Sequence, residues 1–213
     1  MFKKIRREIK DNILKNIKLY LGLFIAFVIG ICAGAFTVNG LGAWQVQELK
    51  NYVEGFLKLL GNQEINNAEL FKGGFIDNLK IAALLWGLGV TIIGIPFIFI
   101  AMGIKGFVTG FSAGFISSAL GFKGVIFILI TVIPKEIIIL PCMLCLGVSG
   151  INFSLLIIKR KKLGQVNSTS LKSGLTSYFL LGLLLVGLIT CGVLVEAYVS
   201  SSLAKLIMPI VIN

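Results

Sequence analysis

The sequence predicts an all-α integral membrane protein: a five-helix transmembrane bundle with an amphipathic N-terminal cytoplasmic helix and a short helical extracytoplasmic loop. Three observations predict this class. The 213-residue chain is 57% hydrophobic and only 14% charged, whereas soluble domains carry roughly 25% charged residues. The charges are clustered, which leaves uncharged runs long enough for helices of roughly 20 residues to cross a bilayer. These runs do not alternate between apolar and polar residues, so they predict helices and not β-barrel strands.

The uncharged runs and Pro134 place five spans, at approximately 19–38, 81–104, 106–133, 137–158 and 175–199. One helix through residues 124–158 would be about 52 Å long, so we expect the chain to turn back near Pro134. Proline lacks a backbone N–H and disfavours helix in the residue before it. The crossing 106–133 could be kinked at Gly121 or Gly124. The first span is expected to be a retained anchor, because its apolar run exceeds that of a signal peptide.

The distribution of basic residues predicts the orientation of the spans. Seven basic residues precede the first span, and the segment 159–174 carries five basic residues and no acid. The segment 39–80 instead carries four lysines against five acids. Cytoplasmic loops collect Lys and Arg. We therefore expect the amino terminus and 159–174 in the cytoplasm, and 39–80 and the carboxyl terminus outside.

An amphipathic pattern precedes the first span. Its apolar residues recur at helical spacing, at Phe2, Ile5, Ile9, Ile13 and Ile17. A helix with this apolar edge and a basic face suits an anionic inner leaflet. We expect it to set the topology, with a partner-binding helix as the alternative.

The segment 39–80 is the largest stretch predicted to lie outside the membrane. Apolar residues recur there at three- and four-residue steps, which predicts amphipathic helix. Its default role is a cap on the membrane or on the bundle, because so short a stretch cannot enclose its own core. The functional alternative is a docking surface for an extracytoplasmic protein, with apolar anchors at Trp44, Tyr52, Phe56, Leu57, Phe71 and Phe75.

Small residues recur every four positions in two of the predicted spans. Such ridges let helix backbones approach closely in lipid. We expect them to pack within one chain, with a homodimer as the alternative. The ridge residues are Gly22, Ala26, Gly30 and Gly34 in the first span, and Gly106, Gly110, Gly114 and Ser118 in the third.

Polar residues within or beside the spans are candidates for function, because charge is costly in lipid. Lys135-Glu136 is expected at an outer-surface turn between two crossings, and the alternative is a polar site within a broken helix. Glu196 is expected to be interfacial or to serve helix packing. The motif as a whole comprises Asn78, Pro134, Lys135, Glu136, Pro141 and Glu196.

Other chemistry finds little support in the sequence. The chain has no histidine, which removes the commonest general base and the commonest metal ligand. Cys142 and Cys145 stand in an apolar helix, where packing is the expected role and redox chemistry the alternative. We expect no catalytic residue, cofactor or metal. Membrane lipid is the expected partner, and nucleic acid is not, because the basic clusters lack interleaved aromatic residues.

Three local patterns, together with the topology, resemble one known family. They are Phe75-Ile76-Asp77-Asn78-Leu79-Lys80-Ile81-Ala82, Pro134-Lys135-Glu136-Ile137-Ile138-Ile139-Leu140-Pro141 and Glu196-Ala197-Tyr198-Val199. They look like the polar approach to the second span, the proline-bracketed segment and the closing acidic-small-aromatic motif of the stage II sporulation protein M family. The resemblance covers nearly the whole chain. Many distant members have His-Gly after the first proline and an acid before the second, so Lys135-Glu136 and Ile139 fit the more apolar sporulation branch better.

The resemblance implies a role in endospore formation. Within this family, the sporulation member is the polytopic part of a complex with stage II sporulation proteins D and P, which cut peptidoglycan during engulfment. It implies a non-enzymatic scaffold that anchors and localises these enzymes at the septal membrane of the mother cell. From the residues alone, a small transporter or channel subunit that uses Pro134-Lys135-Glu136 is the alternative.

Overall fold

The computed structural model describes residues 13–49, 51, 55, 67–162, 168–200, 202 and 203. Its main elements are α2 (Ile17–Asn39), α4 (Asn67–Gly89), α5 (Gly94–Leu120), α6 (Phe122–Thr131), α7 (Ile133–Lys162), α8 (Ser168–Leu194) and the π-helix η1 (Val195–Ser200). The all-helical class is therefore confirmed for the described residues. The predicted amino-terminal amphipathic helix falls largely outside them and stays a prediction.

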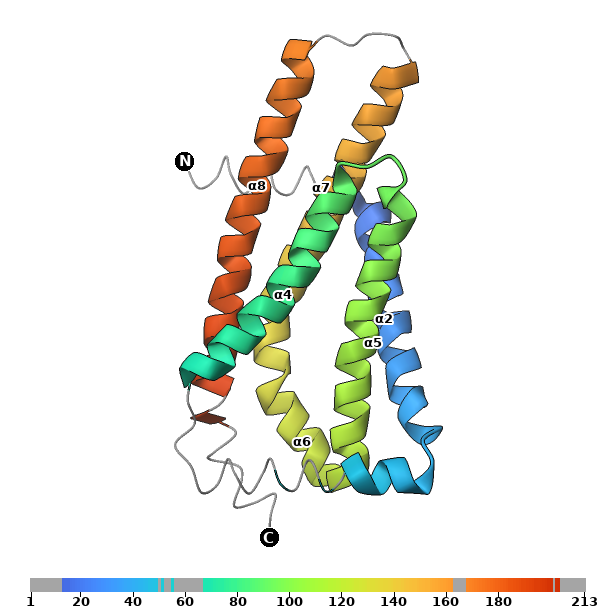
Figure 1. Cartoon of the computed structure of the whole chain (residues 1–213), viewed down its shortest axis with the longest axis vertical. Helices are drawn as coiled ribbons and strands as arrows, with labels where there is room; N and C mark the ends of the chain where they lie inside the picture. Colours follow the sequence, from blue (N-terminus) through green and yellow to red (C-terminus); the bar gives the residue numbers. More distant parts are fainter. Residues whose placement is uncertain are drawn as a thin grey trace.

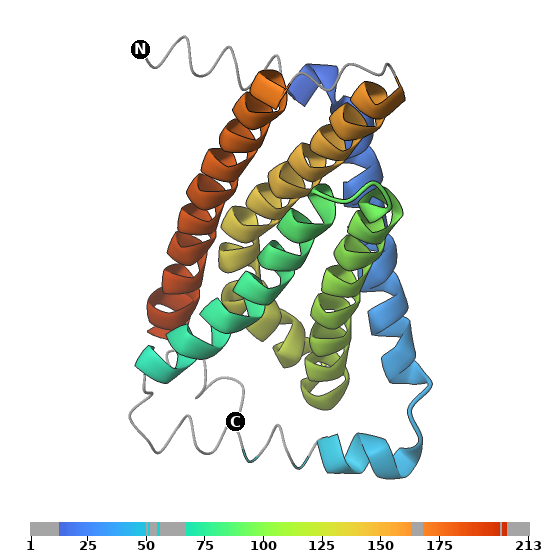
Figure 2. The ribbon, with the colours of Figure 1, turned by 45° about the horizontal axis from the view of Figure 1, so that its top comes forward.

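The helices form a bundle in which the chain reverses direction after α2, α4, α5 and α7 (Figures 1 and 2). Helices α2, α5 and α8 run toward one end, and α4 and the α6–α7 pair run back. We call the end at which α2 finishes and α4 begins the outer end, after the predicted orientation, and the opposite end the inner end. A helical stretch at residues 43–49 lies across the outer end.

Four helical segments in the described residues are long and apolar enough to cross a membrane: Ile17–Asn39, Gly94–Leu120, Ile133–Arg160 and Gly174–Ser200. Large apolar side chains on these segments are exposed, including Ile29, Ile104 and Leu183 at 62%, 57% and 67%, as expected of surfaces that face lipid. The chain is thus a multi-pass membrane protein. Helix α4 is not among the four, since it contains the charged residues Glu69, Lys72, Asp77 and Lys80. A fifth crossing therefore stays a prediction.

The prediction of one continuous crossing at 81–104 is wrong, because the chain turns back at residues 90–93, between α4 and α5. The Thr91 N–H donates to the Leu88 carbonyl over 3.0 Å, and the Thr91 hydroxyl donates to the same oxygen over 2.9 Å. A Cβ at Gly94 would collide with the Leu88 carbonyl, so the turn requires glycine there. The absence of charge in 81–104 did not reveal a turn held by such local contacts.

The prediction that the chain reverses near Pro134 is also wrong. It reverses at Gly121, between α5 and α6, where φ is +61° and ψ is −139°, a conformation that glycine adopts more readily than other residues. Near Pro134 the chain only bends: the Val132 N–H still donates to the Ile128 carbonyl over 2.8 Å. Proline is tolerated there because it lies in the first turn of α7, where an N–H needs no intrahelical partner. The predicted crossing 106–133 is therefore α5 followed by the start of the return.

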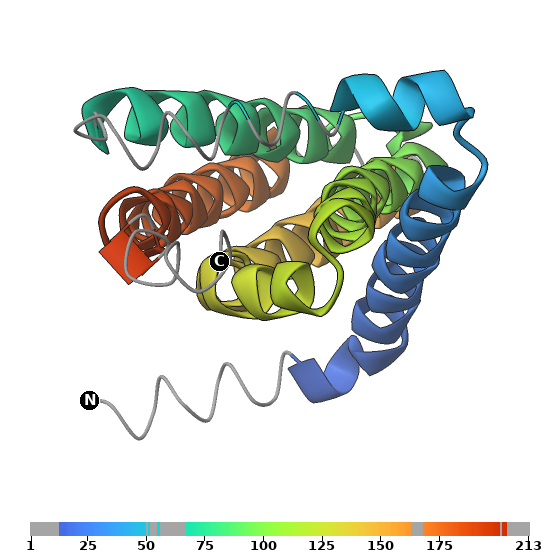
Figure 3. The same ribbon diagram turned by 90° about the horizontal axis from the view of Figure 1, so that it is seen from below.

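The two ridges of small residues face each other, because α2 and α5 pack against each other between Gly22 and Ala35 on α2 and between Phe99 and Gly114 on α5. Figure 3 shows the two helices diverging toward the start of α2. A Cβ at Gly30 would collide with the Gly103 carbonyl, and one at Gly110 would collide with the Ile31 carbonyl. The other ridge positions with a close contact across this interface are Gly22, Gly34, Gly106 and Gly114. Within one chain the ridges thus contact each other, so a homodimer would need another surface.

One apolar core joins the helices. Its fully buried side chains come from every long helix and include Leu23, Leu85, Met102, Met143 and Val193. Cys142 belongs to this core, and Cys145 packs against it. The core fixes the helices around a point at which charged side chains also meet.

Candidate functional site

A cluster of charged and amide side chains lies where α4, α5, α7 and η1 converge. Its members are Asn78 on α4, Lys105 on α5, Lys135 and Glu136 in the first turn of α7, and Glu196 in η1. We call these five residues the polar cluster. Lys105 stands near the middle of α5, about 16 Å along the helix from its first residue, so the cluster lies within the apolar length of the bundle.

The first half of the polar cluster is an ion pair between α5 and α7. The Lys105 ammonium lies 3.4 Å from a Glu136 carboxylate oxygen, and the two side chains are only 12% and 14% exposed. Lys105 also donates to the Asn78 side-chain oxygen over 3.2 Å. The Asn78 amide in turn donates to the Gly74 carbonyl over 2.9 Å, within α4. One lysine therefore connects three helices.

The second half is an ion pair between Lys135 and Glu196, which joins α7 to η1. Both side chains are mostly buried. Gly74 on α4 makes room for the acid, because a Cβ at this glycine would lie 3.1 Å from the second carboxylate oxygen of Glu196. Glu196 stands in a π-helical turn, a local widening that is frequent at functional sites.

The electrostatics of the polar cluster are balanced but incompletely satisfied. Two lysines face two glutamates, so the cluster is formally neutral, as burial in lipid requires. Glu136 is further favoured by its place in the first turn of α7, where the helix dipole stabilises an acid. Among the described residues, the second carboxylate oxygens of Glu136 and Glu196 have no hydrogen-bond partner. The arrangement can clamp helices together, and it retains two free acceptors.

Several predicted site residues come together in this cluster, and others do not. Asn78, Lys135, Glu136 and Glu196 meet, but the expectation of an outer-surface turn at Lys135-Glu136 is wrong, because both residues lie in a helix and are mostly buried. Pro141 is inside α7. Sequence reasoning missed Lys105, which was placed between two spans; its signal was a single lysine within a long apolar run.

The residues predicted to anchor a partner divide into three groups. Trp44 is 74% exposed at the outer end. Phe71 and Phe75 stack on each other, with ring centroids 5.8 Å apart, and pack against the bundle core. Tyr52, Phe56 and Leu57 lie outside the described residues. Of the six, the described part therefore offers Trp44 alone as a largely exposed anchor.

The metal-binding potential of the described residues is low. No group of three or more His, Cys, Asp or Glu side chains that could hold a metal ion occurs in that part of the chain. The polar cluster brings its two acids together with two lysines, a composition typical of ion pairs and not of metal centres.

Comparison with known proteins identifies a family. The family model described as stage II sporulation protein M matches residues 23–201, which include the whole polar cluster. No curated protein and no solved structure is significantly similar to the chain. The match covers most of the sequence and contains all four candidate spans except the first residues of α2. The chain therefore belongs to the stage II sporulation protein M family, which makes it a sporulation-related, multi-pass membrane protein.

Proposed function

We propose that this protein is a non-enzymatic scaffold in endospore formation, which anchors and localises peptidoglycan-degrading enzymes at the septal or engulfing membrane. The observation that carries the proposal is the family match over residues 23–201. Its expected partners, from the resemblance, are stage II sporulation proteins P and D. In this role the membrane bundle provides a rigid base, and the outer end provides the contact.

The outer end supports this assignment through its exposed apolar side chains. Trp44 stands on the helical stretch across this end, and Phe36 and Phe122 are 72% and 79% exposed at the neighbouring helix ends. Exposed aromatic residues can anchor a partner or lie at the membrane interface. In the first turn of α4, the exposed Leu70 adds apolar surface next to Glu69.

The first prediction concerns capture of the hydrolases. We expect a Trp44→Ala/Leu70→Ser variant to retain roughly a tenth or less of the wild-type amount of stage II sporulation proteins P and D, because loss of anchor side chains at an interface commonly costs about 2 kcal/mol or more. The measurement is co-purification of the two enzymes with the tagged protein from sporulating cells.

The matched control for this experiment is Ile93→Ala, at a residue 71% exposed at the inner end. It should leave capture unchanged. Undiminished capture by the outer variant, at equal membrane levels, would count against docking through the outer end. Equal losses in both variants would point to a general defect and also count against it.

A small transporter or channel subunit that uses the Pro134-Lys135-Glu136 segment is the second candidate. The two free carboxylate oxygens beside a bent helix favour it, since transporters bind ions at discontinuous helices. The two lysine partners favour the structural alternative.

The second prediction separates these functions by ion flux. Under the scaffold proposal we expect proteoliposomes of the purified protein to pass protons and Na⁺ no faster than protein-free vesicles, because both acids are neutralised by lysines. The measurement is fluorescence of an entrapped pH or Na⁺ indicator. Flux that disappears in a Lys135→Gln/Glu196→Gln variant would establish the transporter instead.

A further inference from the structure

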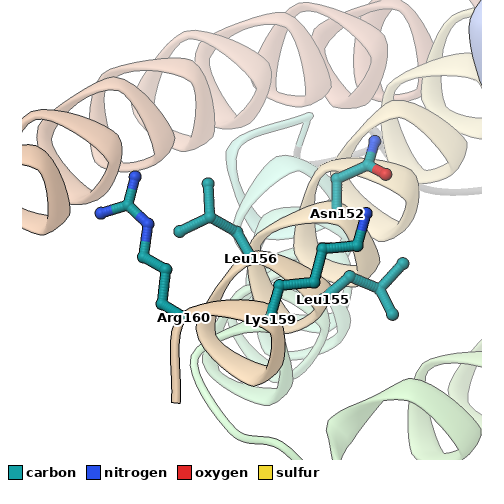
Figure 4. Close-up of a pocket in the computed structure, with 5 residues that line it drawn as sticks. All are labelled: Asn152, Leu155, Leu156, Lys159 and Arg160. Atoms are coloured by element: carbon teal, nitrogen blue, oxygen red, sulfur yellow. The ribbon is translucent and has the colours of Figure 1, made fainter. Parts of the chain in front are cut away.

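The inner end of α7 carries a pocket of about 370 Å³, lined by Asn152, Leu155, Leu156, Lys159 and Arg160 (Figure 4). Their spacing places them on one face of the helix. In Figure 4 the Lys159 ammonium extends toward Asn152, and the Arg160 guanidinium extends to the other side of Leu156. The pocket therefore combines an apolar floor with two cations and one amide.

The turn between α4 and α5 indicates the level of this pocket relative to the membrane. The Ser154 hydroxyl, which is fully buried, lies 2.9 Å from the Gly89 carbonyl and 2.7 Å from the Thr91 carbonyl. Ser154 is thus level with the turn, whose exposed side chains include Ile93 and are suited to hydrocarbon. Lys159 lies five residues further, about 8 Å along α7. Polar head groups occupy roughly 5–8 Å beyond the hydrocarbon on each side, so the two cations reach the level of lipid phosphates.

The charge around the pocket is uniformly positive on the helices that form this end. The sequence has no Asp or Glu between Asp77 and Glu136, or between Glu136 and Glu196, so α5, the rest of α7 and α8 bring no carboxylate to it. Lys15 and Lys18 add exposed positive charge at the start of α2. An anion at the pocket would therefore meet cations without a competing acid on these helices.

We propose that this pocket binds the head group of an anionic phospholipid. Lys159 holds the phosphate, Arg160 attracts the anionic head group from the other side of Leu156, the Asn152 amide hydrogen-bonds to the polar backbone of the lipid, and Leu155 and Leu156 contact the upper part of its acyl chains. A basic helix end alone would serve orientation and the helix dipole, but it would not need an apolar floor. The leucines favour a lipid over a soluble phosphate, which would gain nothing from them.

The third prediction tests this site with lipids of matched acyl chains. We expect the purified full chain to retain dioleoylphosphatidylglycerol in preference to dioleoylphosphatidylcholine, as measured by native mass spectrometry from detergent micelles. A Lys159→Gln/Arg160→Gln variant should bind phosphatidylglycerol about thirtyfold more weakly, because each basic residue near an anionic lipid contributes about 1 kcal/mol. Lys159→Arg should retain the preference.

The control variant Lys72→Gln/Lys80→Gln removes the same charge from α4, which does not line the pocket, and should keep wild-type binding. Equal retention of the two lipids, or an equal loss in both variants, would overturn the proposal. Displacement of phosphatidylglycerol by inorganic phosphate would indicate a soluble-anion site and would overturn it too. Should the double variant fail to fold, Leu155→Ser provides the second test: it should weaken the retention of both lipids, and unchanged retention of phosphatidylglycerol would contradict the role of the apolar floor.

Discussion

Replacing Lys105 by methionine is expected to destabilise the protein by about 3–5 kcal/mol, the usual cost of leaving one partner of a buried ion pair uncompensated. The substitution leaves Glu136, whose side chain is 14% exposed, without its ion-pair partner, and it removes the hydrogen bond to Asn78. The measurement is the free energy of unfolding in mixed micelles during titration with a denaturing detergent. Fluorescence of Trp86 reports the transition, in a background in which Trp44 is replaced by phenylalanine.

Two further variants identify the cause of this loss. The double variant Lys105→Met/Glu136→Met should recover most of the stability, because well-packed apolar residues replace a buried ion pair at little or no cost. The control Lys80→Met breaks the ion pair between Lys80 and Asp77, in which the two side chains are 70% and 75% exposed. It should change the free energy of unfolding by less than about 1 kcal/mol. A loss in Lys105→Met no larger than that of Lys80→Met would show that the buried pair does not hold the bundle together.

The second large effect is expected at the interface between α2 and α5. Gly30→Ala and Gly110→Ala should each lower the free energy of unfolding by about 1–3 kcal/mol, the range for overpacking. At both positions the new methyl group would meet a backbone carbonyl of the facing helix, and a backbone cannot move aside as a flexible side chain can. The same detergent titration measures the change.

Gly87→Ala on α4 is the matched control, since nothing lies within 4 Å of the position that its Cβ would take. Alanine favours helix over glycine by about 1 kcal/mol, so this variant should be equal to the wild type or slightly more stable. If Gly30→Ala and Gly110→Ala behaved like Gly87→Ala, the close approach of α2 and α5 would be contradicted.

The polar cluster shows how much of a buried site local sequence patterns can predict. The sequence marked Asn78, Lys135, Glu136 and Glu196 as costly polar groups near or within apolar helices, and all four belong to the cluster. It did not reveal their pairing. Lys105 is 27 residues from Asn78 along the chain, and Lys135 is 61 residues from Glu196. Such partners are chosen by the packing of several helices, which no single run of residues encodes.

The sequence by itself determined that the protein is surrounded by the lipid bilayer and that its segments are helical. Both depend on hydrophobic length and on the clustering of charge, which are local properties of the chain. Only the tertiary structure decided where the chain turns, at residues 90–93 and at Gly121, and which charges face each other. The physical reason is that a turn within an apolar run depends on a few backbone contacts, and an ion pair in lipid depends on the distance between helices remote in sequence.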